Sequence, residues 1–234
     1  MRTYEDDPLW HTLTGRHASF AIGSGSVRRF VAAVSNLAAL APDATSSAWI
    51  ELKGLLEPGE AVAFFFFEPA PSIPDDGGLR VVYEGDYDQM VCTSMTSATH
   101  PSVPFIHLGA GDVADMLALV ELTQPGPFAE RTIELGRFIG VRHNGQLVAM
   151  AGERCRFAGF REVSAVCTHP DYRGRGLAEA LVRDLVSEAQ MHDEVPVLHV
   201  RGDNDVARRA YERIGFTIRR PMKVVAVQRL RSPA

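Results

Sequence analysis

The chain has 234 residues, of which 46% are hydrophobic and 23% are charged, the composition of a soluble globular protein that can bury a sizeable core. Its 24 Lys and Arg against 29 Asp and Glu give a net charge of −5. This balance disfavours nucleic acid as a partner, because non-specific binding to phosphates requires a surplus of cations.

The cysteines, the histidines and the apolar runs argue against three further classes of protein: metal-binding, secreted and membrane proteins. The three cysteines form no CxxC pair and the eight histidines no HExxH spacing, so we expect reduced thiols and no metal site. The N-terminal "MRTYEDDPLW" is polar and acidic, unlike a signal peptide, and the apolar run 61–67 is too short to span a bilayer. We expect a cytoplasmic protein with no membrane partner.

The first half of the chain predicts a small strand-rich domain. Gly/Pro/Ser-rich segments separate short strand-like runs, and the phenylalanine run 64–67 is typical of a strand buried on both faces. We find no chemical constellation in this half. A segment at 96–104, the seam, is rich in small polar residues and prolines and predicts a boundary between a domain at 1–95 and a domain at 104–234. The expected strands are 17–22, 61–68, 79–87 and 89–95, and the expected helix is 46–60.

The second half is more regular. Asp112 can cap a helix, and Asn144-Gly145 is a strong hairpin signal between two strands. Helices that alternate with strands predict an α+β domain with a mixed sheet covered by helices on both faces. The expected strands are 104–109, a hairpin over 137–157, 160–170, 195–202 and 216–230, and the expected helices are 112–123, 125–136, 175–190 and 205–215.

An Arg-Gly-Arg-Gly turn joins the strand 160–170 to the next helix. The first turn of a helix carries unpaired N–H groups and the positive end of the helix dipole, so it binds anions such as phosphates. Gly174 and Gly176 would let a phosphate approach the backbone, and Arg173 and Arg175 would add charge. The turn therefore predicts a pyrophosphate site, with a solvated glycine-rich turn as the alternative.

The turn and a second element about thirty residues later together resemble the GNAT superfamily of acyl-CoA-dependent N-acetyltransferases. The resemblance covers about residues 104–234, and the first half would suit a degenerate second copy of the fold. The family's Arg/Gln-x-x-Gly-x-Gly/Ala turn is matched by Arg173, Gly174, Arg175, Gly176, Leu177 and Ala178, and its next element by Asn204, Ala207, Tyr211 and Gly215-Phe216.

The resemblance implies a splayed mixed sheet with acetyl-CoA, as the acyl donor, in the gap between two strands. The turn, with Asn204 and Ala207, would bind the cofactor. Main-chain groups of Val166, Cys167 and Thr168 would pair with pantetheine as an added strand does, and one N–H at Cys167 or Thr168 would polarise the acetyl carbonyl. We expect residues 1–95 to shape an acceptor site or an interface rather than to bind the cofactor.

The same resemblance implies direct attack by a primary amine, with two proton movements. Glu162 is the candidate to take a proton from the amine. The alternatives are that Glu162 is only a solvated carboxylate at the end of a strand, or that an ordered water takes the proton. Tyr211 matches the tyrosine that protonates the CoA thiolate in the family, and its alternative role is that of a core tyrosine. Cys167 is more simply an apolar filler than an acyl carrier. A small-molecule amine, a protein amine, the acyl-chain preference and a homodimer all stay open.

Two other functions compete with an acetyltransferase. Gly109-x-Gly111-x-x-Ala114 follows a strand and precedes a helix, as in a dinucleotide-binding turn, but the next strand ends in His143 and Asn144 instead of an acidic residue. A non-catalytic acyl-CoA sensor on the GNAT fold would carry the same cofactor motif. Only the tyrosine at the general-acid position favours the enzyme.

Overall fold

The computed structural model describes residues 6–67, 69, 72–73, 78–97 and 103–231. The strands are β1 (Ala21–Ile22), β2 (Val27–Phe30), β3 (Ala38–Leu40), β4 (Ala61–Phe66), β5 (Leu79–Val91), β6 (Ile106–His107), β7 (Phe138–His143), β8 (Gln146–Phe157), β9 (Phe160–Thr168), β10 (Val195–Arg201) and β11 (Thr217–Arg229). The α-helices are α1 (Pro8–Thr14), α2 (Ala48–Leu55), α3 (Val113–Thr123), α4 (Leu177–Met191) and α5 (Asp205–Ile214), and the short 3₁₀ helices are η2 (Ala18–Phe20), η3 (Ala110–Asp112), η4 (Thr132–Leu135) and η5 (Pro170–Tyr172).

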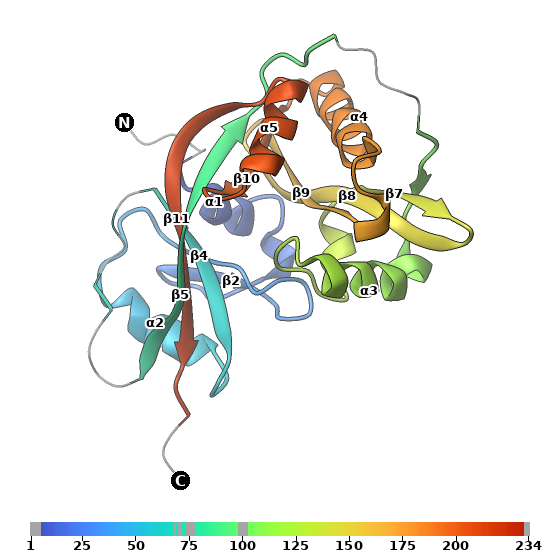
Figure 1. Cartoon of the computed structure of the whole chain (residues 1–234). Coiled ribbons are helices and arrows are strands. Elements are labelled where there is room, and N and C mark those ends of the chain that lie inside the picture. The colour runs from blue at the N-terminus through green and yellow to red at the C-terminus, as the bar shows by residue number, and fades with distance from the viewer. Residues whose placement is uncertain (1–5, 68, 70–71, 74–77, 98–102, 232–234) are drawn as a thin grey trace.

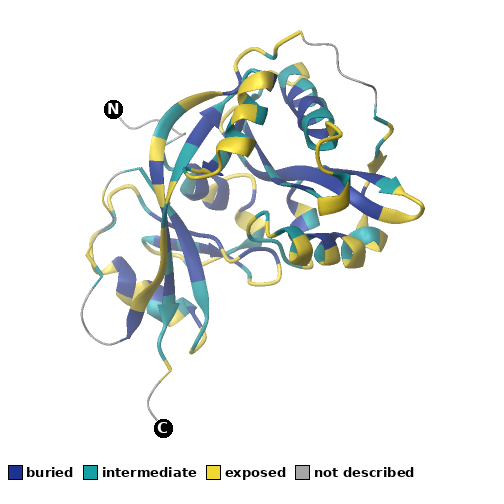
Figure 2. Ribbon diagram, viewed as in Figure 1, coloured by how far each residue is buried: buried dark blue, intermediate teal, exposed yellow. Residues whose placement is uncertain are grey.

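A large mixed sheet forms the centre of the molecule, in the strand order β4-β11-β5-β10-β9-β8-β7-β6, and β1, β2 and β3 form a smaller sheet (Figure 1). Side chains alternate across a strand, so neighbouring residues enter different cores. Ile139 packs under α4 with Leu185, whereas Phe138 packs against α3 with Met116. The strands between these helices are largely buried (Figure 2). The predicted α+β sheet with helices on both faces is confirmed.

The two halves of the chain share the large sheet. β5, from the first half, lies between β10 and β11 and is antiparallel to both, while β11 lies between β4 and β5. The last strand of each half therefore lies between two strands of the other half. The domains 1–95 and 104–234, and the first half as a degenerate copy, stay predictions; residues 98–102 of the seam lie outside the described residues. A fragment 104–234 would lack the strand that joins β10 to β11.

Several sequence expectations differ from the structure. The segment 125–136 is not an α-helix and contains only η4, because Gly126 has a φ of +130° and prolines flank it without backbone N–H groups. The two strands expected at 79–87 and 89–95 form the single strand β5. The strand expected at 17–22 is mostly η2. Patterning also missed α1, β2 and β3, which are short.

His17 is a buried titratable group in the first half. Its side chain is 3% exposed, it lies between Phe20 and Phe30, and neither ring nitrogen has a hydrogen-bond partner among the described residues. Burial, with smaller effects from the cations Arg16 and Arg156, lowers its pKa to about 4. The folded protein therefore holds His17 neutral at pH values where the unfolded chain, with a histidine pKa of about 6.5, binds a proton.

This difference predicts a pH-dependent stability. Between pH 6.5 and about 4 the unfolded state binds more protons at this site, so the free energy of unfolding falls as the pH falls. At about 1.4 kcal/mol per pKa unit, the loss is on the order of 3 kcal/mol. Urea unfolding of the wild type and of His17→Leu measures it: the difference between their pH slopes should appear in this window. Parallel slopes would contradict the prediction.

Candidate active site

The parallel strands β9 and β10 separate halfway along their length. Their pairing runs from Val195–Phe160 to Val197–Glu162 and then ends. On its other side β9 pairs with β8 through a bulge, where Ala165 adopts a φ of +52°. From residue 163 to 168 the backbone of β9 therefore faces β10 across a gap rather than through hydrogen bonds. This is the splayed sheet that the family resemblance implied.

The glycine turn lies between η5 and α4. Gly174 and Gly176 have φ values of +74° and +75°, a region that favours glycine, and Gly176 is the N-cap of α4. A Cβ atom added at either glycine would meet no protein atom within 4 Å. The glycines thus leave open space directly beside the first N–H groups of a fifteen-residue helix. A phosphate fits both the space and the charge of this end.

The two arginines of the turn are fixed beside it by backbone contacts. Arg173 Nε lies 3.4 Å from the carbonyl oxygen of Thr168, and Arg175 Nη2 donates to the carbonyl oxygen of Asp171 at 3.1 Å. The Arg175 guanidinium also lies 4.7 Å from the centre of the Tyr172 ring. Both arginines are exposed. Their charges add to the helix dipole at the point where an anion would bind.

A cleft of about 1270 Å³ connects the gap between the strands with the turn. Every residue that the sequence predicted for the site lines it, although these residues are spread over 50 positions of the chain, from 162 to 211. They are Glu162, Val166, Cys167, Thr168, Arg173, Gly174, Arg175, Gly176, Leu177, Ala178, Asn204, Ala207 and Tyr211. The structure brings these residues together, and their individual roles stay predictions.

Tyr211 enters the cleft from α5. The Asn204 side chain caps this helix by accepting a hydrogen bond from the Ala207 N–H at 3.1 Å, and the Tyr211 ring packs edge-on against Phe216 at 5.9 Å. Burial, together with the nearby Cys167 thiol, raises the pKa of Tyr211 to about 12. The phenol is therefore protonated at neutral pH and able to donate a proton.

Cys167 lies near this phenol on β9. Its side chain is buried, in a cluster with Met116, Leu119 and Phe138. Burial raises the pKa of the Cys167 thiol to about 11. A protonated thiol is a poor nucleophile, which favours the expected packing role over an acyl carrier.

Glu162 is fully buried at the point where the strands separate. Arg154 donates to it twice, from Nε at 3.1 Å and from Nη2 at 2.5 Å, and His199 Nδ1 lies 2.7 Å from Oε1. Burial alone would raise the pKa of Glu162, but the charge of Arg154 and the contacts of His199 hold it well below its ordinary range. Such a carboxylate is a weak proton acceptor. The geometry favours charge and positioning over proton uptake, and the catalytic role stays a prediction.

A chain of side chains fixes the donors that reach Glu162. Arg219 Nη1 donates to Gln89 Oε1 at 2.9 Å, which turns the Gln89 amide nitrogen toward His199 Nε2 at 3.2 Å. Because Nε2 then accepts, His199 carries its proton on Nδ1 and donates it to Glu162. With Arg154, this chain crosses the adjacent strands β11, β5, β10, β9 and β8. These partners of Glu162 were not predicted from the sequence; polar residues within apolar strands were the available signal.

Removal of the Glu162 charge should destabilise the protein. Glu162→Gln places an NH₂ group among the donors of Arg154 and His199, and breaking a buried ion pair typically costs about 3–5 kcal/mol. The matched control is Asp203→Asn, which breaks the similar two-bond pair with Arg201 on the surface, where solvent screens the charges and the loss of stability should be small. Urea unfolding measures both. Equal losses would show that the buried pair has no special role.

The cleft extends beyond the predicted residues into the first half of the chain. Leu37, Ala63 and Phe65 line it, and so do Tyr83 and Tyr87 of β5. The run 64–67 was expected to be buried on both faces, but only Phe64 is buried and Phe65 faces the cleft, with its ring centre 4.7 Å from that of His199. The expectation for this run was wrong because β4 lies at the edge of the sheet.

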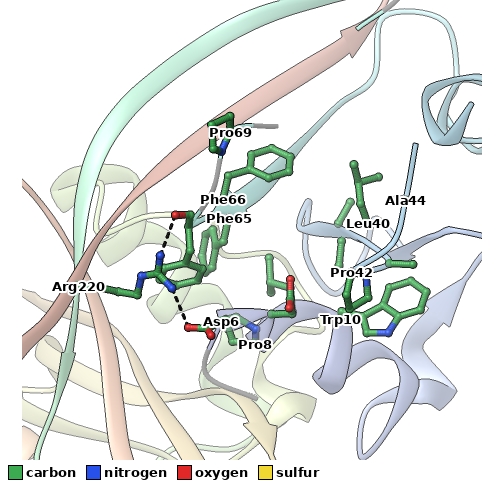
Figure 3. A pocket seen from close by; sticks show the side chains of 16 residues that line it. Asp6, Pro8, Trp10, Leu40, Pro42, Ala44, Phe65, Phe66, Pro69 and Arg220 are labelled. Carbon is green, nitrogen blue, oxygen red and sulfur yellow. Dashed lines mark hydrogen bonds and ion pairs between the residues drawn. The ribbon is translucent and has the colours of Figure 1, made fainter. Parts of the chain in front are cut away.

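A second cavity of about 510 Å³ also has Phe65 in its lining (Figure 3). Trp10, Phe66 and Pro42 surround it, and Arg220 joins its wall by hydrogen bonds to Asp6 and to the carbonyl oxygen of Phe67. Both guanidinium nitrogens that Figure 3 shows in contact are therefore used within the protein. We assign no ligand to this cavity.

The described part of the chain holds neither a cluster of metal ligands nor a helix that could span a membrane. No group of three or more His, Cys, Asp or Glu side chains there could hold a metal ion. None of the helices described is long and apolar enough to cross a membrane.

Known proteins resemble this chain in sequence and in fold. The family model described as FR47-like protein matches residues 138–225. The N-alpha-acetyltransferase RimI of Mycobacterium tuberculosis is 34% identical over 136 residues, which cover 52% of this chain and 82% of that protein.

Solved structures extend the likeness to the first half. The crystal structure of a GNAT-family acetyltransferase from Novosphingobium aromaticivorans is 36% identical, with a TM-score of 0.88 over 98% of this chain and 100% of that chain. A GCN5-related N-acetyltransferase from Kribbella flavida, 15% identical, has a TM-score of 0.62 over 96% of this chain and 93% of that chain, which shows a shared fold alone.

Proposed function

This chain belongs to the GNAT family of acetyltransferases, and we propose that it transfers the acetyl group of acetyl-CoA to a primary amine by direct attack in a ternary complex. The observation that carries the proposal is the cleft, in which the gap between β9 and β10 opens onto the glycine turn at the start of α4. One site thus offers backbone groups for pantetheine and an anion site for pyrophosphate.

The cofactor would bind along this cleft in two parts. The N–H groups at the start of α4, with Arg173 and Arg175, would hold the pyrophosphate. The backbone of 166–168 would pair with the pantetheine arm, since β10 has separated from β9 there. An N–H at Cys167 or Thr168 would then point at the acetyl carbonyl and stabilise the oxyanion.

The chemistry needs an amine that has lost its proton and a thiolate that gains one. The neutral amine nitrogen attacks the acetyl carbon, and the carbon–sulfur bond breaks as the CoA thiolate leaves. We propose that the Tyr211 hydroxyl protonates this thiolate, since it is protonated at neutral pH and lines the same cleft. Glu162 stays the candidate carboxylate for the amine. Held ionised by Arg154, it would act by charge on the ammonium while water carries the proton away.

The acceptor is proposed only as a primary amine, of a small molecule or of a protein. The relative from Mycobacterium tuberculosis is named an N-alpha-acetyltransferase, which supports an α-amino group among these. The acyl-CoA sensor is the competing function on the same cleft.

Thiol release from acetyl-CoA with a panel of amines tests the proposal. We expect release that depends on both the protein and an amine. Tight acetyl-CoA binding in a calorimetric titration without release for any amine would instead support the sensor. Absence of binding would overturn the assignment of the cleft itself.

A further inference from the structure

The part of the cleft formed by the first half has an aromatic wall. Tyr83 and Tyr87 lie on the same face of β5, four residues apart, and Phe65 comes from β4. Tyr87 pairs with Arg201 at the end of β10, and Tyr83 lies four residues farther along β5, opposite Ala226 of β11. Both tyrosines line the cleft. None of these three residues belongs to the motifs that form the cofactor site.

Gly85 shapes this wall. A Cβ atom at Gly85 would lie 2.3 Å from the Tyr83 hydroxyl oxygen and 2.8 Å from the ring carbon that bears it. The absence of a side chain therefore lets the Tyr83 ring lie along the strand, with its hydroxyl 3.3 Å from that of Tyr87. Tyr83 keeps 41% of its surface exposed. Tyr83 thus presents an exposed ring to the cleft instead of filling a core.

The charged groups in the same region are already paired within the protein. Glu162 is bound by Arg154 and His199, and Arg201 is bound by Asp203 through two hydrogen bonds. Glu179, farther along the cleft, pairs with two arginines. Among the described lining residues no carboxylate is left for a second ammonium group. The wall suits one amine joined to an apolar group, which the rings can cover.

We propose, on the basis of the proposed function, that the acceptor is a primary amine attached to a flat apolar group, which lies against Tyr83. Two sources share this chemistry: a free arylalkyl amine and a peptide with an aromatic N-terminal residue. A polycationic amine would find no counter-charge here. Tyr83 is then a specificity-determining residue, and Gly85 is a positioning residue that holds its ring in place.

Four amines test the substrate class by thiol release from acetyl-CoA. They are phenethylamine, ethylamine, spermidine and a short peptide that begins with phenylalanine. We expect kcat/KM for phenethylamine or the peptide to exceed that for ethylamine by at least about tenfold, since covering a ring adds buried area and aromatic contact. The better of the two identifies the source. A kcat/KM for ethylamine equal to that for phenethylamine and the peptide, or a preference for spermidine, would overturn the inference about the acceptor but leave the proposed function in place.

Variants of the wall test the residues. Tyr83→Ala removes the ring, and Gly85→Ala displaces it without removing it. Both should raise KM for the ring-bearing amine about tenfold, with unchanged KM for ethylamine and for acetyl-CoA. Tyr83→Phe, which keeps the ring, should restore the wild-type value. Unchanged KM in Tyr83→Ala would contradict the proposal.

A binding measurement distinguishes a failure of the Tyr83 wall to bind the acceptor from a failure of the proposed acetyl transfer. Phenethylamine titrated calorimetrically into the protein saturated with CoA, which has no acetyl group to transfer, should bind the wild type and bind Tyr83→Ala about tenfold more weakly. Binding without turnover would support the wall and overturn the proposed function. Turnover of ethylamine without phenethylamine binding would support the proposed function and overturn the role of the wall.

Discussion

Gly176→Val should weaken acetyl-CoA binding by at least about a hundredfold. The added side chain would occupy the space that Gly176 leaves open at the start of α4, where no protein atom lies within 4 Å of the Cβ position. Loss of two charge-assisted hydrogen bonds, each worth about 1.5–3 kcal/mol, suffices for this factor. The φ of +75° adds a strain of about 1–2 kcal/mol for a side chain, which further disturbs the turn. Calorimetric titration with acetyl-CoA measures the loss.

Gly145→Val is the matched control. Gly145 lies in the hairpin between β7 and β8, has a φ of +82° and also has open space around its Cβ position. Its valine variant should therefore lose a similar amount of stability and keep wild-type affinity for acetyl-CoA. If both variants bind equally well, the pyrophosphate does not sit on the turn, and the assignment of the cofactor end fails.

Tyr211→Phe should lower kcat by about 10²–10⁴, the usual effect of removing a positioned general acid. The ring and its packing on Phe216 are kept, so the change isolates the hydroxyl. A phenol pKa of about 12 lies above that of a thiol, near 8.5 by analogy with cysteine. The transfer is thus uphill in isolation and requires that the site stabilise the phenolate or resupply its proton. Acetyl-CoA affinity should stay nearly constant, which marks an interaction made in the transition state.

Two further readouts make this prediction decisive. The wild-type rate should not fall between pH 7 and pH 10 through loss of the Tyr211 proton, because burial raises its pKa to about 12. Near-UV circular dichroism of Tyr211→Phe should match that of the wild type. A folded variant with near-normal kcat would return Tyr211 to a packing role on α5.

The second half was predictable because its signals are local. Asn144-Gly145 makes a hairpin, and Gly174 and Gly176 form a turn between a strand and a helix, each for reasons confined to a few residues. The resemblance to a family then placed these signals in one site, and the structure brings the predicted residues into one cleft.

The first half and the partners of Glu162 were not predictable in the same way. The insertion of β5 between β10 and β11 depends on pairing between residues more than 100 positions apart, such as Tyr87 with Arg201 and with Met222. No local pattern records such a pairing. The pairing of β5 with β10 brings His199 and Gln89 into contact, so this contact could not be predicted without the strand order.

We propose that this cleft holds acetyl-CoA while its acetyl group is transferred to an amine. The most direct measurement uses acetyl-CoA with an isotopic label in the acetyl group, incubated with the protein and the amine panel, and detects the product by mass spectrometry. We expect a labelled acetyl group on an amine nitrogen, with equal amounts of product from the wild type and Gly145→Val and far less from Gly176→Val. Labelled acetyl-CoA recovered intact with every amine, despite a folded protein that binds it, would show that the cleft binds the cofactor without transferring its acetyl group.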